Sequence, residues 1–174
     1  MKYLITLPWT PYPATDGGKQ GSFNMLMELQ NMIDITLIYP VFFKKQMACQ
    51  YLLEKQLPKV KVYPFEYYKN KDGIKSQYSL FRLHRIITRK FLKQPYLATP
   101  IYKDAYIDFV NEIIKKERID IVQNEYFEQL YMVYAIPNTV KKVFIQHEIQ
   151  YIAKERLIQQ REYPSSVRYL ATMQ

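Results

Sequence analysis

Three short polar segments each follow a predicted strand, and their residue types could bind or convert a ligand. The segments are Asp16 to Lys19, Asn124 with Glu125, and His147 with Glu148. In an open parallel sheet, ligands bind beyond the carboxyl ends of the strands, where the strand order reverses. In the common order 3-2-1-4-5 the first, fourth and fifth strands are neighbours. We therefore expect these segments to meet around one cleft at the carboxyl edge of the sheet.

Glycines are concentrated where the first helix is expected to begin, at Gly17, Gly18 and Gly21. Without Cβ atoms they would let an anion approach free backbone N–H groups, and the helix dipole would favour its charge. The order Gly-Gly-x-x-Gly differs from the dinucleotide fingerprint Gly-x-Gly-x-x-Gly and follows a long loop, which disfavours a nicotinamide or flavin cofactor. A flexible loop with a glycine N-cap remains the alternative.

His147 directly follows the apolar run Val143 to Ile145, at a strand end where a side chain can point into the cleft. A histidine there can donate a hydrogen bond to a ligand hydroxyl or move a proton near neutral pH, so His147 is the candidate catalytic residue. The alternative is a partly buried histidine bonded to backbone. His84, the other histidine, lies among arginines and is predicted to be on the surface.

A basic segment runs from Gly73 to Lys103 and contains no acidic residue. Its central cations are Arg82, Arg85, Arg89 and Lys90. They flank an apolar helical stripe, as in helices that lie on anionic membranes with the apolar side inward. The segment is therefore a candidate membrane or acceptor patch. In the alternative the stripe packs on the sheet and the cations are simply solvated.

The composition excludes several classes of protein. With 48% hydrophobic and 24% charged residues, the 174-residue chain can bury a full core, so disorder is excluded as its main character. A single cysteine rules out a disulfide framework and a cysteine zinc site and fits a cytoplasmic setting. No apolar stretch is long enough for a membrane span. The net charge of +9 favours acidic partners without choosing among nucleic acid, membrane and phosphorylated ligands.

Strands alternate with helices along the whole chain. Strands are predicted at 3–7, 33–39, 60–63 (closed by Pro64), 119–123 and 140–146. Helices are predicted from the start signal at Thr15 and Asp16 to about 31, and at about 42–57, 77–93, 102–116, 127–134 and 150–161. This alternation predicts the α/β class, with one Rossmann-like open parallel sheet and helices on both faces. The last residues end without a strand or charged tail that would finish the fold, so we expect a fragment of a longer protein.

Three stretches resemble the N-terminal half of family 4 glycosyltransferases, which have the GT-B fold. They are Tyr-Leu-Ile-Thr-Leu followed by Pro-Trp-Thr-Pro-Tyr-Pro and Asp-Gly-Gly, then Ile-Asp-Ile-Val-Gln-Asn-Glu, and Lys-Lys-Val-Phe-Ile-Gln-His-Glu. The resemblance covers nearly the whole chain. It implies that residues 1–174 form a single acceptor-side domain, and that a C-terminal domain holding most of the nucleotide-sugar donor is absent from this chain.

The same resemblance implies roles for individual residues. Gly17 and Gly18 would approach the donor phosphates, His147 would contact the donor sugar, and Glu125 would face the same cleft. The reaction implied is transfer of a hexose-type sugar with retention and without metal or other cofactor, onto a glycan or lipid-linked acceptor. Surface polysaccharide synthesis at the inner membrane face would suit the basic surface, and this isolated domain would be inactive.

Two alternatives from other classes stay open. One is a non-catalytic Rossmann-like binding domain, in which changing the histidine would cost no activity. The other is a basic nucleic-acid-binding domain. The positive net charge favours it, but the sequence contains no recognised nucleic-acid-binding motif. We expect no nucleic-acid partner.

Overall fold

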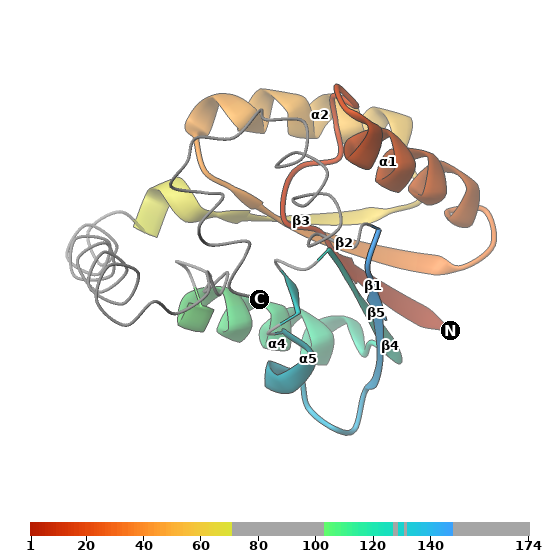
Figure 1. Ribbon diagram of the computed structural model, residues 1–174, viewed down its shortest axis with the longest axis vertical. Coiled ribbons are helices and arrows are strands. Elements are labelled where there is room, and N and C mark those ends of the chain that lie inside the picture. Colours follow the sequence, from red (N-terminus) through yellow and green to blue (C-terminus); the bar gives the residue numbers. More distant parts are fainter. Residues whose placement is uncertain (71–102, 127–128, 131, 148–174) are drawn as a thin grey trace, which may run out of the picture.

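Strand β1 (Lys2–Thr6) lies at the centre of a parallel sheet, as its apolar sequence predicts. The structure is a computed structural model that describes residues 1–70, 103–126, 129–130 and 132–147. The other strands are β2 (Asp34–Val41), β3 (Lys61–Glu66), β4 (Ile121–Glu125) and β5 (Lys141–Ile145). Within the described residues the order is β3-β2-β1-β4-β5, and every neighbouring pair is parallel (Figure 1). The predicted α/β class and strand order are confirmed.

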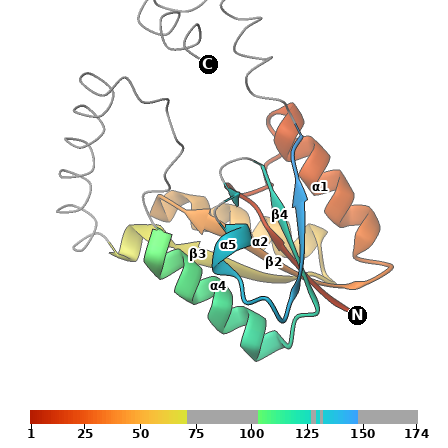
Figure 2. The same ribbon diagram turned by 60° about the horizontal axis from the view of Figure 1, so that its bottom comes forward.

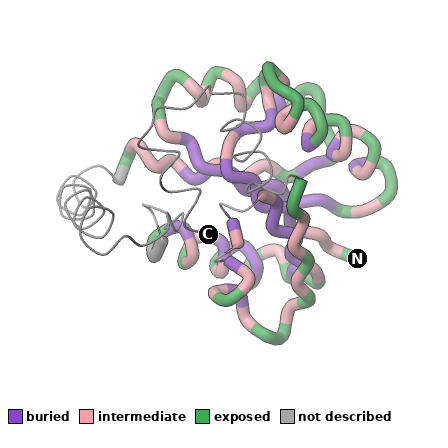
Figure 3. Tube along the Cα trace, viewed as in Figure 1, coloured by how far each residue is buried: buried purple, intermediate pink, exposed green. Residues whose placement is uncertain are grey.

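Helices cover both faces of this sheet (Figures 1 and 2). The helical segments are α1 (Gly17–Leu29), η1 (Lys44–Gln46), α2 (Met47–Gln56), η2 (Tyr67–Asn70), α4 (Lys103–Glu117) and α5 (Met132–Ala135). Because side chains alternate along a strand, the adjacent residues Leu4 and Ile5 enter different cores. Leu4 joins the core beneath α4 and α5, and Ile5 the core beneath α1 and α2. Both are fully buried, and Figure 3 shows this burial along the central strands.

Some predicted boundaries are wrong. Strand β3 continues through Pro64 to Glu66, because it lies at the edge of the described sheet, where a residue without N–H can face away from its single neighbour. Strand β4 ends at Glu125 and not at Gln123, so Asn124 and Glu125 belong to the strand and do not follow it. Helix α5 covers Met132–Ala135, and residues 127, 128 and 131 of the helix predicted at 127–134 lie outside the described part of the chain.

Other predictions concern residues outside the described part of the chain. These are the helices at 77–93 and 150–161, Glu148, His84, and the patch of Arg82, Arg85, Arg89 and Lys90. Among the helices that the structure describes, none combines the length and apolar character needed to cross a membrane.

Helix α4 ends in a left-handed residue that is not glycine. Arg118 has φ of 56°, and its N–H donates to the carbonyl of Lys115 while the N–H of Ile119 donates to that of Ile114. This pair of bonds defines a Schellman motif, in which the left-handed position usually belongs to glycine because a Cβ is strained there.

We predict that Arg118→Gly stabilises the protein by about 0.5 to 1 kcal/mol, because relief of the Cβ strain exceeds the loss of a favourable charge at the helix end. The free energy of unfolding in urea measures the effect. Arg118→Ala is the matched control, since it removes the same charge and keeps the Cβ. Equal stability of the Gly and Ala variants would contradict this account of the helix end.

Candidate functional site

Five residues meet at the carboxyl edge of the sheet, where β1 and β4 lie side by side. They are Gly18 and Ser22 of α1, Glu125 at the end of β4, Tyr126 after it, and His147 after β5. We call these residues the edge cluster. The chain leaves β1 toward β2 on one side, whereas β4 and β5 continue the sheet on the other, so the cluster lies at the point where the strand order reverses.

Glu125 is the buried centre of the edge cluster, with none of its surface exposed. Its Oε1 accepts a hydrogen bond from Gln123 Nε2 (2.6 Å), and its Oε2 accepts one from Ser22 Oγ (3.1 Å). His147 Nε2 lies 3.1 Å from the same Oε2. The side chain of His147 is 35% exposed, so in this pair the imidazole, and not the carboxylate, is the group that a ligand can reach.

Two successive hydrogen bonds inside the protein hold the Glu125 carboxylate in place. Tyr3 donates through its hydroxyl to Gln123 Oε1 (2.8 Å), which orients the amide so that Nε2 faces Glu125. Burial, and secondly the negative charge of Glu125, raise the pKa of Tyr3. Tyr3 therefore stays protonated and remains a donor at neutral pH.

Tyr126 joins the two halves of the edge cluster. Its ring stacks on His147 with centroids 4.4 Å apart and planes 24° apart, and it also lies 4.6 Å from the ring of Trp9. Its hydroxyl donates to the carbonyl oxygen of Gly18 (2.8 Å) and lies 3.2 Å from Ser22 Oγ. The first turn of α1 and the imidazole are thus connected through one side chain.

The start of α1 is capped by its own residues. Asp16 Oδ1 accepts from the backbone N–H of Lys19 (2.9 Å), and Lys19 Nζ lies 3.2 Å from Asp16 Oδ2. The hydrogen bond from that N–H is the main cause of a lowered pKa of Asp16, so its carboxylate is charged at neutral pH. The predicted helix start at Asp16 is confirmed. An anion bound at this helix N-terminus would lie beside the Asp16–Lys19 ion pair, which already uses the backbone N–H of Lys19.

Only one of the three glycines is needed for a close contact. A Cβ on Gly18 would lie 3.1 Å from the Tyr126 hydroxyl oxygen, whereas a Cβ on Gly17 or Gly21 would have nothing within 4 Å. The missing side chain of Gly18 therefore makes room for Tyr126, which belongs to the protein itself. Gly17 is exposed at the first position of the helix.

The structure thus brings together Gly18, Glu125 and His147 of the predicted site residues, with Gly17 adjacent. It adds Ser22 and Tyr126. Ser22 follows Gly18 by four residues, a helical spacing that would have placed the two on one face. For Tyr126 the sequence held no such signal, because strand alternation predicts that it faces away from Glu125.

Asn124, which precedes Glu125, is separate from the edge cluster. Its buried Oδ1 accepts from Thr6 Oγ1 (2.8 Å), and alternation along β4 directs it to the α4 side of the sheet. Within the described residues, no group of three histidine, cysteine, aspartate or glutamate side chains is placed to hold a metal ion.

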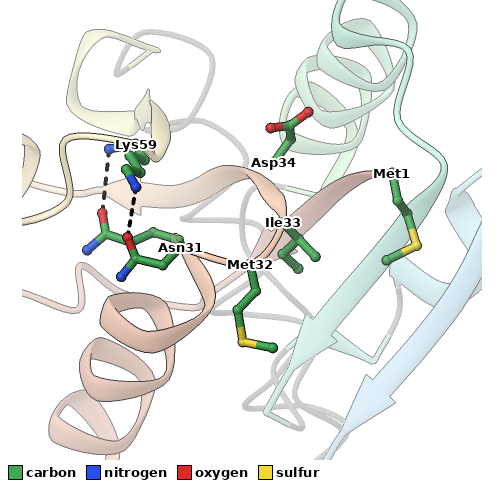
Figure 4. A pocket seen from close by; sticks show the side chains of 7 residues that line it. Met1, Asn31, Met32, Ile33, Asp34 and Lys59 are labelled. Atoms are coloured by element: carbon green, nitrogen blue, oxygen red, sulfur yellow. Dashed lines mark hydrogen bonds between the residues drawn. The ribbon is translucent and has the colours of Figure 1, made fainter.

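An open hollow of ≈ 390 Å³ lies at the opposite, amino edge of the sheet. Figure 4 shows Met1, Met32 and Asp34 around it, with Lys59 Nζ donating to Asn31 Oδ1 (2.9 Å). It contains no pair resembling His147 and Glu125, and ligands of parallel sheets bind at the other edge. We therefore place the candidate site at the edge cluster.

Comparison of the sequence with models of known protein families and with curated proteins gives no match.

The Gly18 contact yields a prediction about α1. Gly17→Ala should stabilise the protein by about 0.5 kcal/mol, because alanine loses less backbone entropy in a helix than glycine. Gly18→Ala should gain less or lose stability, because its Cβ presses on a tyrosine that Trp9 and His147 hold in place. Urea unfolding gives the stability, and fluorescence of Trp9, the one tryptophan, reports displacement of Tyr126. If both variants behave alike by both measures, the close contact is wrong.

Proposed function

We propose that this chain is the N-terminal, acceptor-side half of a retaining glycosyltransferase, and that the edge cluster receives the sugar and diphosphate of a nucleotide-sugar donor. The observation that carries the proposal is His147, held on the buried Glu125 beside the start of α1. This group lies at the carboxyl edge of a parallel sheet, which is the edge where α/β proteins bind ligands. The resemblance of three sequence stretches to family 4 glycosyltransferases supplies the reaction.

The groups of the edge cluster suit the two parts of such a donor. The exposed imidazole can hydrogen-bond a sugar hydroxyl. The N–H groups at the start of α1, with Lys19 beside them, favour the negative charge that develops on a leaving diphosphate. These interactions stabilise charge without a metal ion. The remaining donor contacts would come from a second domain, so the isolated chain should bind weakly and turn over little.

The acceptor and the location follow from charge. A net charge of +9 favours a lipid-linked or otherwise anionic acceptor and attachment to an anionic membrane surface. Arg82, Arg85, Arg89 and Lys90 are the predicted contact, and changing all four to Gln should abolish cosedimentation with anionic vesicles.

Ligand binding by the isolated chain tests the proposal. Saturation-transfer NMR should detect UDP-glucose, GDP-mannose or UDP-N-acetylglucosamine in the millimolar range. His147→Ala should weaken the nucleotide sugar about fivefold, because one hydrogen bond to the sugar is worth about 1 kcal/mol. The parent nucleoside diphosphate is the control ligand, and its affinity should not change.

Two results would contradict the proposal. One is the absence of binding for all three nucleotide sugars with a folded protein. The other is an equal loss of affinity for the nucleotide sugar and for the nucleoside diphosphate in His147→Ala, because the histidine would then support the fold in general and not bind the sugar.

A further inference from the structure

We infer that Glu125 and Tyr126 are positioning residues for His147, which they hold with Nδ1 as the one ring nitrogen left to meet the ligand. In the neutral imidazole this nitrogen accepts a hydrogen bond from a ligand hydroxyl. The identity of that ligand as a sugar rests on the proposed function. The positioning itself rests only on the contacts of the edge cluster.

The hydrogen bonds of Glu125 determine the tautomer of His147. An ionised carboxylate only accepts hydrogen bonds, and donors approach both of its oxygens: Gln123 at Oε1 and Ser22 at Oε2. With Glu125 ionised, His147 Nε2, which shares Oε2 with Ser22, is therefore the donor in this contact. Nδ1 has no hydrogen-bond partner among the described residues. Neutral His147 thus presents an acceptor to the ligand, and a hydroxyl fits it where a phosphate oxygen does not.

The backbone at Tyr126 allows two consecutive residues to serve the same imidazole. In a regular strand, Glu125 and Tyr126 would point to opposite faces of the sheet. Tyr126 instead has φ of 68°, a conformation that is strained for a bulky side chain. Both side chains consequently reach Ser22, at 3.1 Å and 3.2 Å, and both contact His147. Glu125 fixes one edge of the ring and Tyr126 fixes its plane.

The tautomer can be measured without any ligand. The chain has two histidines, so a long-range ¹H–¹⁵N spectrum at pH 8 contains two ring patterns, and His84→Gln identifies that of His147. We expect His147 to be wholly in the Nε2–H form, with this N–H protected from exchange with water. An Nδ1–H form, a mixture of forms, or an unprotected N–H would overturn the inference, whether or not nucleotide sugars bind.

Three variants of Glu125 and Tyr126 test whether position, and not charge, is what His147 needs. Glu125→Ala should lower nucleotide-sugar affinity by up to about fivefold, the full loss expected for His147→Ala, and abolish the protected N–H. Glu125→Gln keeps an amide oxygen for Nε2–H and should stay within about threefold of the parent. Tyr126→Phe keeps the ring and should preserve the tautomer while it frees the Gly18 carbonyl.

The same changes in a His147→Ala background provide the control. Glu125→Ala should cost no further affinity there, because a positioning residue acts only through the residue it positions. If Glu125→Ala still lowers nucleotide-sugar affinity as much in that background, Glu125 acts on the fold in general, and the inference is overturned. A Glu125→Gln variant as weak as Glu125→Ala also overturns it, since charge and not position would then matter. If the Ala variant does not fold, the Gln variant and the ring spectrum decide.

Discussion

The arrangement of this site depends on one buried carboxylate. A carboxylate removed from water is strongly destabilising unless hydrogen bonds or opposite charge replace its hydration. For Glu125, donors come from three separate parts of the chain: Gln123 in the same strand, Ser22 in α1, and His147 after β5. The requirement to satisfy this group therefore holds a helix and the ends of two strands in one geometry. Loss of any one donor would leave the carboxylate less well solvated.

Functional geometry follows from this structural requirement. The carboxylate and its lower supports, Gln123 and Tyr3, are inside the protein, and only the imidazole extends from them toward solvent. Tyr126 links this arrangement to the start of α1, because its hydroxyl donates a hydrogen bond to the carbonyl oxygen of Gly18. The position is the reversal point of strand order in a parallel sheet, where helix N-termini and strand ends face the same side. A sugar hydroxyl and a diphosphate are ligand groups that this pairing of imidazole and helix start would suit together.

Much of the fold could be predicted from the sequence, because local patterns determined it. The buried run at β1 and the alternation of strands and helices predict the observed strand order, and the start signal at Asp16 predicts the cap of α1. Their positions after strands predict that Gly18, Glu125 and His147 lie together, and they do meet. What could not be predicted depended on contacts between distant residues. The burial of Glu125 depends on a hydrogen bond from Ser22, which lies 103 positions away in the sequence. The turn at Tyr126 requires a left-handed backbone conformation, which a tyrosine in the sequence does not indicate. The sequence does not show that Pro64 can continue β3, because proline is tolerated there only since β3 lies at the edge of the described sheet.

The central claim is that the carboxyl edge between β1 and β4 binds a nucleotide sugar through His147 and the start of α1. The most direct measurement is a titration of the ¹⁵N-labelled chain with UDP-glucose or GDP-mannose, followed by backbone amide shifts. The account predicts that the largest changes occur at Gly17, Gly18, Lys19, Tyr126 and His147. Changes confined to the opposite edge, at Met1, Asp34 and Lys59, or no changes at millimolar ligand, would contradict it.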